Sequence, residues 1–417
     1  FYMVYEYMTS ALSALHDFNG SDGSDPRGSL TFSNVGGKKA VLYGVTSLGG
    51  ANNNGTIFSF SIGEDKNSGF KTLHSFKNSE EYGSGIQPHH NSMNLIGDKL
   101  YGATLYGGSL DNPRKSKSNK TKGNGNLFSI KTDGTKYTVI HPFKGWGKDP
   151  FPAKDGARAH SPFIVDEKKN IAYGMTSGGG SKNDGTIYSF ELDNPKKTYK
   201  ILHSFKKSTG KTPHGQLAFN EDKTKLYGMT RKGGVKDENN GSGDGVIFSY
   251  DINTNDYEPI LNFNGKEYGA VNKHGFLSLY EDNFYGTTSQ GGLYDKGTLF
   301  SIHEHEHEDE HDYEESYNQF HSFGQHVADG ANPYGSLTLV KDKFYGTTQF
   351  GGEKGYGTVF ELDPSTGIFT NLASLNQTIG IHPEDNLIAN NQGTMLYGLA
   401  QEGGQHGKGT IFSVSLV

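Results

Sequence analysis

Short apolar stretches recur along the whole chain and alternate with polar segments rich in glycine. The stretch from Leu42 to Phe60 shows the unit: an apolar segment carrying Tyr-Gly, then Gly-Gly, a third glycine and a second apolar segment. In every copy the Gly-Gly pair begins six residues after the tyrosine. The seven tyrosines are Tyr43, Tyr101, Tyr173, Tyr227, Tyr285, Tyr345 and Tyr397. Repeats of this length predict an array, a solenoid or a propeller.

Each repeat has room for four strands. The first copy predicts an A strand at 29–32, a B strand carrying Tyr43, a C strand at 55–62 and a D strand at 71–76, with turn-forming residues between them. We therefore expect an all-β, seven-bladed β-propeller of four-stranded antiparallel blades. The expected blades are approximately 28–76, 92–143, 161–205, 214–263, 274–323, 334–375 and 386–417 plus 10–18, after an N-terminal arm at 1–9.

The two ends of the chain complement each other. The last copy ends in its C strand, whereas a D-like segment, Ala11 to Phe18, stands before the first A strand. We expect this N-terminal strand to complete the last blade and close the ring, which removes an exposed sheet edge. A stacked open solenoid is the alternative, and it needs no such exchange.

The repeat carries a family resemblance. The pattern Tyr-Gly-x-Thr-x-x-Gly-Gly, followed by Gly-Thr-x-Phe-Ser, resembles the tandem repeat of Gloeobacter and Verrucomicrobia proteins over roughly residues 11–417. It is also similar to the kelch unit, and it departs at Asn126 and Val246, which replace the threonine after the third glycine. The resemblance implies a secreted or surface-displayed β-propeller and no particular reaction, because propellers host many functions.

Composition narrows the classes of function. The chain of 417 residues has no cysteine, which excludes disulfides, thiol catalysis and cysteine-ligated metals. Its net charge of −7 argues against a general nucleic-acid role. The sequence contains no apolar run of the roughly 18 residues that a membrane span needs. We expect an extracellular or surface location, although the absence of cysteine does not fix the compartment.

Residues that recur in every copy are expected to be scaffold. The Tyr-Gly glycine suits a bulge or close packing of neighbouring blades, and the Gly-Gly pair suits a turn with positive φ. A phosphate cradle would require a helix N-terminus, which this pattern does not predict. Histidines recurring in the D strands are expected to be structural and hydrogen-bonded. They are His16, His74, His141, His203 and His321.

Function should lie where the copies differ. Strand order places the B–C and D–A loops on one face and the A–B and C–D loops on the other. The D–A connections end in a variable slot just before strand A, which we expect at the mouth of the central channel. Residues at or close to this slot are Arg27, His89, His160, His214, His274, Tyr334, His382 and Glu384. These side chains suit an anionic or hydroxyl-rich ligand such as an acidic glycan, and capping of strand A is the alternative.

Two long loops on the same face add candidates. The B–C loop at 109–124 is basic and includes Arg114 and Lys115, so it would attract an anion, or it is simply a solvated loop. The D–A connection at 144–161 holds the only tryptophan, Trp146, which is a candidate platform for a sugar ring or an anchor for its own loop.

A histidine- and glutamate-rich insert lies between strands C and D of the fifth copy, at 302–312. In an extended chain His303, His305 and His307 share one side and would bind Zn, Ni or Cu weakly. A solvated acidic loop is the alternative, and we expect no required cofactor.

These features favour a non-catalytic β-propeller that binds a glycan or other surface macromolecule through its B–C/D–A face, without nucleic acid. A structural component of an extracellular assembly or particle surface, packed against copies of itself, is one alternative. A carbohydrate-active propeller enzyme is another, although no copy-specific carboxylate pair, nucleophile motif or metal triad stands out.

Overall fold

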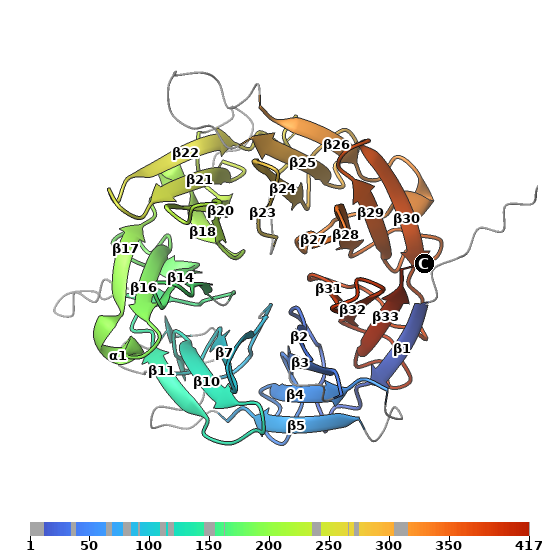
Figure 1. Ribbon diagram of the computed structural model, residues 1–417, viewed down its shortest axis with the longest axis horizontal. Coiled ribbons are helices and arrows are strands. Elements are labelled where there is room, and N and C mark those ends of the chain that lie inside the picture. Colours follow the sequence, from blue (N-terminus) through green and yellow to red (C-terminus); the bar gives the residue numbers. More distant parts are fainter. Residues whose placement is uncertain are drawn as a thin grey trace, which may run out of the picture.

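The computed structural model describes residues 12–34, 39–63, 69–77, 85–90, 92–108, 114–115, 121–145, 155–161, 163–235, 243–265, 267–270, 275–303 and 316–416. Seven antiparallel sheets stand around a common axis as the blades of a propeller (Figure 1). Strand A of each sheet is innermost and strand D forms the outer rim. The predicted seven-bladed β-propeller of four-stranded blades is therefore confirmed.

The blades follow the chain in order. Blades 1 to 3 contain β2 (Thr31–Ser33), β3 (Val41–Thr46), β4 (Thr56–Ser61) and β5 (Phe70–Ser75); β6 (Asn94–Ile96), β7 (Lys99–Thr104), β10 (Asn126–Lys131) and β11 (Thr138–Pro142); and β13 (Ile164–Asp166), β14 (Ile171–Thr176), β16 (Thr186–Glu191) and β17 (Lys200–Ser204). Blades 4 and 5 contain β19 (Ala218–Phe219), β20 (Lys225–Lys232), β21 (Val246–Asp251) and β22 (Tyr257–Asn262); and β23 (Ser278–Tyr280), β24 (Asn283–Thr288), β25 (Thr298–His303) and β26 (Asn318–Ser322). Blades 6 and 7 contain β27 (Thr338–Val340), β28 (Lys343–Thr348), β29 (Thr358–Asp363) and β30 (Ile368–Ser374); and β31 (Ile388–Ala389), β32 (Met395–Ala400), β33 (Thr410–Ser415) and β1 (Leu12–Asp17).

Short strands and helical turns lie in the connections between the blade strands. The pieces β12 (Gly156–Ala157) and β15 (Gly178–Gly179) pair with each other, as do β8 (Arg114–Lys115) and β9 (Thr121–Lys122). A further strand, β18 (Lys211–Pro213), joins β20 in blade 4. The helical turns are α1 (Pro195–Thr198), η2 (Lys207–Thr209) and η3 (Val327–Asp329). Among the described residues, none of the helices is long and apolar enough to cross a membrane.

The ring closes with the first strand of the chain. Strand β1 pairs antiparallel with β33, so the last blade has the order β1-β33-β32-β31. Phe18, which follows β1, is fully buried and packs against Phe58 of blade 1 at a ring distance of 5.3 Å. The predicted closure by an N-terminal strand is confirmed, and it joins the last blade to the first through a shared core.

The glycine of each Tyr-Gly pair makes room for an aromatic ring. Gly44 stands opposite Phe58 in the pairing of β3 with β4. A Cβ atom on Gly44 would lie 2.4 Å from Cζ of Phe58, far inside van der Waals contact. The ring therefore folds over the bare backbone of its own blade. The expected bulge or contact between neighbouring blades is replaced by a contact within one blade.

A buried threonine pair joins the end of strand B to the start of strand C. In blade 6 the hydroxyls of Thr348 and Thr358 lie 2.8 Å apart, and Thr348 also accepts a hydrogen bond from the Thr358 amide. In blade 4, where Val246 replaces the second threonine, the amide bond to the Thr230 hydroxyl persists at 3.0 Å. The departure at Val246 thus removes one hydroxyl and leaves the backbone contact intact.

The D-strand histidines connect neighbouring blades. Each one stacks on an aromatic ring at the start of the next D strand; His141 and Tyr199, for example, have ring centroids 3.7 Å apart and nearly parallel planes. The five stacked pairs are His16–Phe70, His74–Tyr137, His141–Tyr199, His203–Tyr257 and His321–Phe369. These histidines are therefore structural, as predicted.

Hydrogen bonding of these histidines differs between blades. An aspartate in the following D–A connection contacts Nε2 in three of them, through the pairs His16–Asp22, His141–Asp155 and His321–Asp329. Nε2 of His74 and Nε2 of His203 are buried without a hydrogen-bond partner among the described residues. The expected hydrogen bond is thus absent at Nε2 of these two, and stacking alone holds that side of the ring.

Every blade has a bulge between its two outer strands. The register of C with D shifts once in each of the seven sheets, for example between Ile57 and Phe58 where β4 pairs with β5. The pairing of B with C keeps its register throughout. A bulge increases the local twist of a strand pair, so the two outer strands of each blade are expected to twist more than the inner ones.

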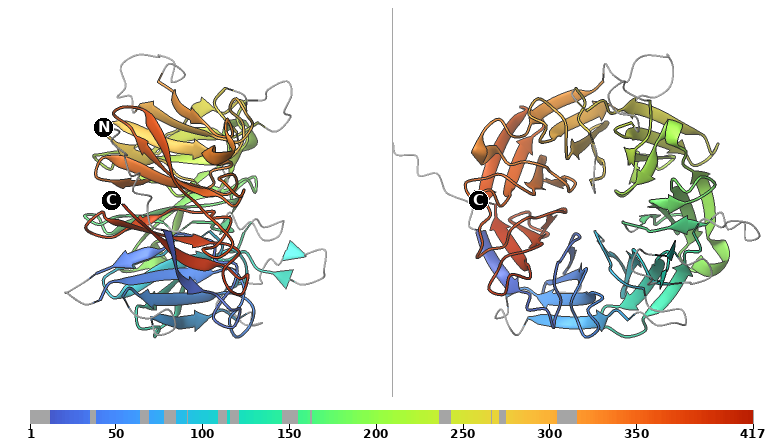
Figure 2. Two further views of the ribbon diagram at one scale, coloured as in Figure 1. Left: turned by 90° about the vertical axis from the view of Figure 1, so that its right-hand side faces the viewer. Right: turned by 180° about the vertical axis from the view of Figure 1, so that it is seen from behind.

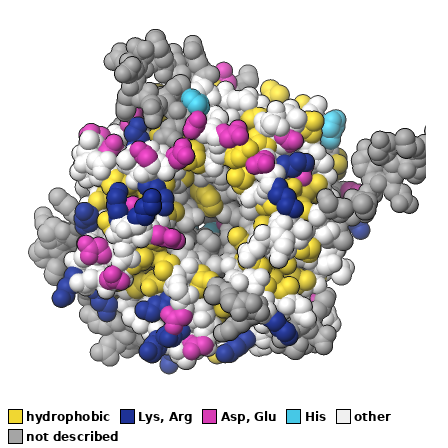
Figure 3. Space-filling view, in the orientation of Figure 1, with side chains coloured by type: hydrophobic (Ala, Val, Ile, Leu, Met, Phe, Trp, Pro, Cys, Tyr) yellow, Lys and Arg dark blue, Asp and Glu magenta, His cyan; other side chains and the backbone are white. Residues whose placement is uncertain are grey.

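The two faces of the disc carry different connections. The side view in Figure 2 shows the β8–β9 hairpin, part of a B–C loop, projecting from the side opposite the C-terminus, which ends a C strand. Figure 3 shows the face with the A–B and C–D turns, where basic and acidic side chains are interspersed and the centre is hollowed. The variable B–C and D–A loops lie on the opposite face.

Candidate functional site

The D–A connections bring their slot residues together at the inner end of the ring. Seven of these side chains form a chain of contacts that runs over five blades. We call them the inner polar ring: Glu384 and Asp385 of blade 7, Arg27 of blade 1, His89 and His90 of blade 2, His160 of blade 3 and His214 of blade 4. Tyr334 occupies the same slot in blade 6 and is also buried, whereas His274 of blade 5 lies outside the described residues.

The first half of the inner polar ring consists of carboxyl groups in contact with a guanidinium and an imidazole. Nη1 of Arg27 lies 3.3 Å from Glu384, and Nε of Arg27 donates to Asp25 at 2.8 Å. Nδ1 of His90 lies 3.0 Å from the Asp385 carboxylate, although the two residues are 295 positions apart in the chain. Burial raises the pKa of the Asp385 carboxyl well above its ordinary value, and the neighbouring Glu384 raises it further.

The second half consists of imidazoles in a less polar setting. His160 and His214 stack with ring centroids 3.9 Å apart, and His89 approaches His160 edge-on at 6.3 Å. Burial, with the Arg27 charge, lowers the pKa of His89 to about 3. Burial and the neighbouring His214 lower the pKa of His160 well below its ordinary value. These two rings are thus neutral at physiological pH.

The backbone around this ring is also tied from blade to blade. The Ser161 hydroxyl donates to the carbonyl of His214, and the Thr347 hydroxyl donates to the carbonyl of Asp385. Asn386 receives a hydrogen bond from the amide of Ser336 at 2.7 Å. The slot side chains of these five blades thus contact one another and are largely buried, so they have little surface free for a ligand.

Two members of the ring, His90 and Asp385, were not singled out from the sequence. His90 could have been found by counting back from the buried apolar residue just before strand A. Leu30 stands three residues after Arg27, and Met93 stands three residues after His90. Blade 2 therefore has one extra residue, His89, in its connection. Asp385 replaces the glycine that follows the slot in blades 1, 4, 5 and 6.

A basic cavity lies farther out on the same face, between blades 3 and 4. Its volume is about 560 Å³, and its walls are Lys182, Asp184, Lys206, Lys207, Ser208 and Gly234. We call this cavity the lysine groove. Lys182 and Asp184 come from the B–C loop of blade 3, the next three residues from the following D–A connection, and Gly234 from the B–C loop of blade 4.

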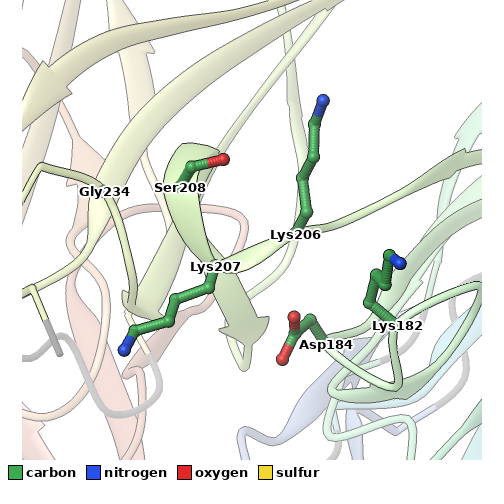
Figure 4. A pocket seen from close by; sticks show the side chains of 6 residues that line it. All are labelled: Lys182, Asp184, Lys206, Lys207, Ser208 and Gly234. Carbon is green, nitrogen blue, oxygen red and sulfur yellow. The ribbon is translucent and has the colours of Figure 1, made fainter.

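The loops of the lysine groove are held by their own backbone. The Gly234 amide donates to the carbonyl of Lys207 at 2.9 Å, and the Thr212 amide donates to that of Asp184 at 2.7 Å. Figure 4 shows the three lysine side chains pointing in different directions from this base. Their charges therefore spread over the surface, which suits an extended anion better than a single small one.

The remaining candidate residues have mixed outcomes. Arg114 and Lys115 form β8 on the predicted face. Trp146, His305 and His307 lie outside the described residues, and His303 ends β25 with its side chain exposed. His382 lies against Phe350 with ring centroids 5.0 Å apart, and its Nδ1 is 3.9 Å from Glu402. In the described part of the chain, no group of three metal-ligating side chains could hold a metal ion.

Comparisons with known proteins concern the repeat and the fold. The model of the Gloeobacter/Verrucomicrobia repeat matches residues 116–319 and 311–417. No curated protein matches the chain.

Among solved structures, puromycin hydrolase is 10% identical with a TM-score of 0.50, and the match covers 90% of this chain and 50% of that one. A puromycin-hydrolyzing peptidase of Mycobacterium tuberculosis is 11% identical (TM-score 0.49, coverage 94% and 52%). A candidate 6-phosphogluconolactonase of Bacteroides uniformis is 12% identical (TM-score 0.46, coverage 82% and 83%). Identities this low show a shared fold alone.

Proposed function

The chain belongs to the Gloeobacter/Verrucomicrobia repeat family, and from this premise we propose that it is a non-catalytic binding propeller, outside the cell or at its surface. Its ligand is an acidic glycan, bound across the B–C/D–A face. The observation that carries the proposal is the lysine groove, a cavity whose walls include three lysines and one aspartate from two loops.

Electrostatics supports this site more directly than the inner polar ring. The inner carboxyl groups of Glu384 and Asp385 contact Arg27 and His90, so these polar groups already have partners within the protein. The ammonium groups of Lys182 and Lys206 have no ion-pair partner among the described residues. An extended polyanion would neutralise this sector.

The test compares a soluble acidic polysaccharide with a neutral one. Polygalacturonate and dextran serve as probes, and affinity is measured by calorimetry at two salt concentrations. Lys182→Ala and Lys206→Ala should each weaken binding of polygalacturonate about two- to fivefold, in line with an exposed charge contact. Lys168→Ala, an exposed lysine in the A–B turn of blade 3, is the matched control on the opposite face.

Three results would reject the proposal: equal affinity of the groove variants and wild type, equal affinity for dextran, or no dependence on salt. Release of reducing or unsaturated sugar from the probe would instead support the carbohydrate-active alternative.

A further inference from the structure

The large apolar side chains that the described residues expose are concentrated on one face. Seven such side chains are exposed, and five of them lie on B–C loops or D–A connections of blades 4 to 6. These five are Val235, Leu293, Tyr294, Val327 and Phe350. Leu293 and Val327 are 75% and 77% exposed, so neither contributes to the core. We call these five residues the apolar loop tips.

Two of the apolar loop tips, Tyr294 and Val327, occupy positions that carry lysine in the lysine groove. Tyr294 and Lys182 each stand three residues after the first glycine of their Gly-Gly pair. Val327 and Lys207 each begin the helical turn, η3 or η2, that precedes the next glycine. The same scaffold therefore presents positive charge at blades 3 and 4 and apolar side chains at blades 5 and 6. Folding does not require either choice, because both sets are exposed.

Charged residues close to the apolar loop tips are balanced. Asp295 and Lys296 follow Tyr294 directly, and Glu353 and Lys354 follow the Gly-Gly pair of blade 6. The Asp295 carboxylate accepts a hydrogen bond from the Gly291 amide at 3.0 Å, so it has a role within its own loop. The face thus has a basic sector and an almost neutral apolar sector side by side.

We propose that this face docks on an anionic lipid bilayer. The apolar loop tips enter the boundary between head groups and acyl chains, and Lys182, Lys206 and Lys207 contact the negative head groups. Aliphatic and aromatic side chains next to lysines are the combination by which proteins bind a bilayer surface without spanning it. The tips stand on separate loops of three blades, and a bilayer can accept each tip on its own, whereas a protein partner needs a fitted surface.

This inference goes beyond glycan binding, because it gives a role to side chains that a polyanion would leave uncovered. It shares with the proposed function only the face and its lysines. Soluble polygalacturonate and vesicles therefore report on the two proposals separately: Leu293 and Val327 matter for vesicles alone.

The experiment measures co-sedimentation of the full chain with phosphatidylcholine vesicles that contain or lack phosphatidylserine. We expect binding only to the phosphatidylserine vesicles. Leu293→Ser with Val327→Ser should weaken it about tenfold or more, since each tip buries apolar area in the interface. Lys206→Ala and Lys207→Ala should each weaken it about fivefold and reduce its dependence on salt. Tyr294→Trp gives a probe whose emission should shift to the blue on binding.

Two variants control for general effects of substitution. Ile368→Ser removes an apolar side chain that is 60% exposed at the start of β30, next to a C–D turn on the other face, and Lys168→Ala removes a charge there. Neither should alter binding to vesicles. The inference is overturned if wild type ignores phosphatidylserine vesicles or if the Leu293/Val327 variant binds them as wild type does. Loss of self-association in that variant, without vesicle binding by wild type, would assign the tips to a protein interface instead.

Discussion

Ring closure can be tested at Phe18, because blade 1 provides a matched control. Phe18 follows β1, and its amide donates to the carbonyl of Gly409 at 3.0 Å. Phe76 follows β5, and its amide makes the corresponding bond to Gly55 at 3.0 Å. Both rings are fully buried, with their nearest C-strand phenylalanine at 5.3 and 5.6 Å. The difference is that β1 is joined to its blade by pairing alone, whereas β5 is covalently continuous with blade 1.

Truncating a buried phenylalanine to alanine costs about 3–5 kcal/mol. At Phe76 this cost falls on the stability of the whole domain. At Phe18 it falls on a strand that can leave its blade without unfolding the rest, so the free energy of local opening drops by the same amount. At about 1.4 kcal/mol for each factor of ten, that is a hundredfold to a few thousandfold rise in the open population.

Hydrogen exchange followed by mass spectrometry measures this population directly. Phe18→Ala should lower the protection of amides in β33 by a hundredfold or more, and Phe76→Ala should leave β33 unchanged relative to the other C strands. Opening also exposes an unpaired strand edge, so the Phe18 variant should aggregate at concentrations where wild type is monodisperse. Equal protection of β33 in the two variants would refute the view that β1 acts as a separable closing strand.

Further predictions concern the repeat glycine, the threonine pair and the buried histidines. Gly346→Ala should destabilise the protein by about 1–3 kcal/mol in chemical denaturation, because its Cβ would lie 2.4 Å from Cζ of Phe360; Gly407→Ala, with no atom within 4 Å, should cost only the roughly 1 kcal/mol of a positive φ. Thr358→Val should hardly change the free energy of unfolding, because blade 4 carries valine at this position. Thr348→Val should lower it by about 1–3 kcal/mol, because buried donors lose their acceptor. A lower melting temperature for Thr358→Val than for Thr348→Val would contradict this. The pKa of His89 is lowered from 6.5 to about 3, so on acidification the unfolded chain takes up this proton before the folded protein does. The stability that the neutral His89 contributes is therefore present above pH 6.5 and is lost as the pH falls toward 3. Between pH 7 and pH 5 this should remove about 2 kcal/mol, and His89→Gln should reduce that loss in thermal melts.

The propeller was predictable from sequence because its signals are local and repeated. Gly44 and Phe58 stand in one hairpin, and the same pair recurs in each blade, so seven copies reinforce one pattern. The D-like segment before Phe18 revealed the closure, since the last copy lacked a D strand.

The inner polar ring was less accessible to sequence reasoning. His90 and Asp385 are in contact although 295 residues separate them in the chain. Which slot side chains face each other depends on how the seven blades pack around the central axis. One extra residue in the connection of blade 2, His89, was enough to obscure that His90 holds the slot position there. Three separate segments line the lysine groove: the B–C loop of blade 3, the D–A connection that follows blade 3, and the B–C loop of blade 4. No single stretch of sequence therefore displays it.

The bulge between strands C and D has a consequence for how copies of this disc can meet. A flat outer strand offers a row of backbone donors and acceptors to any similar strand nearby. Here the register shift interrupts that row once in each of the seven rim strands, so two discs brought edge to edge cannot extend a common sheet. The rim therefore offers no unbroken template to a neighbouring strand, which disfavours stacking of these molecules through their circumference.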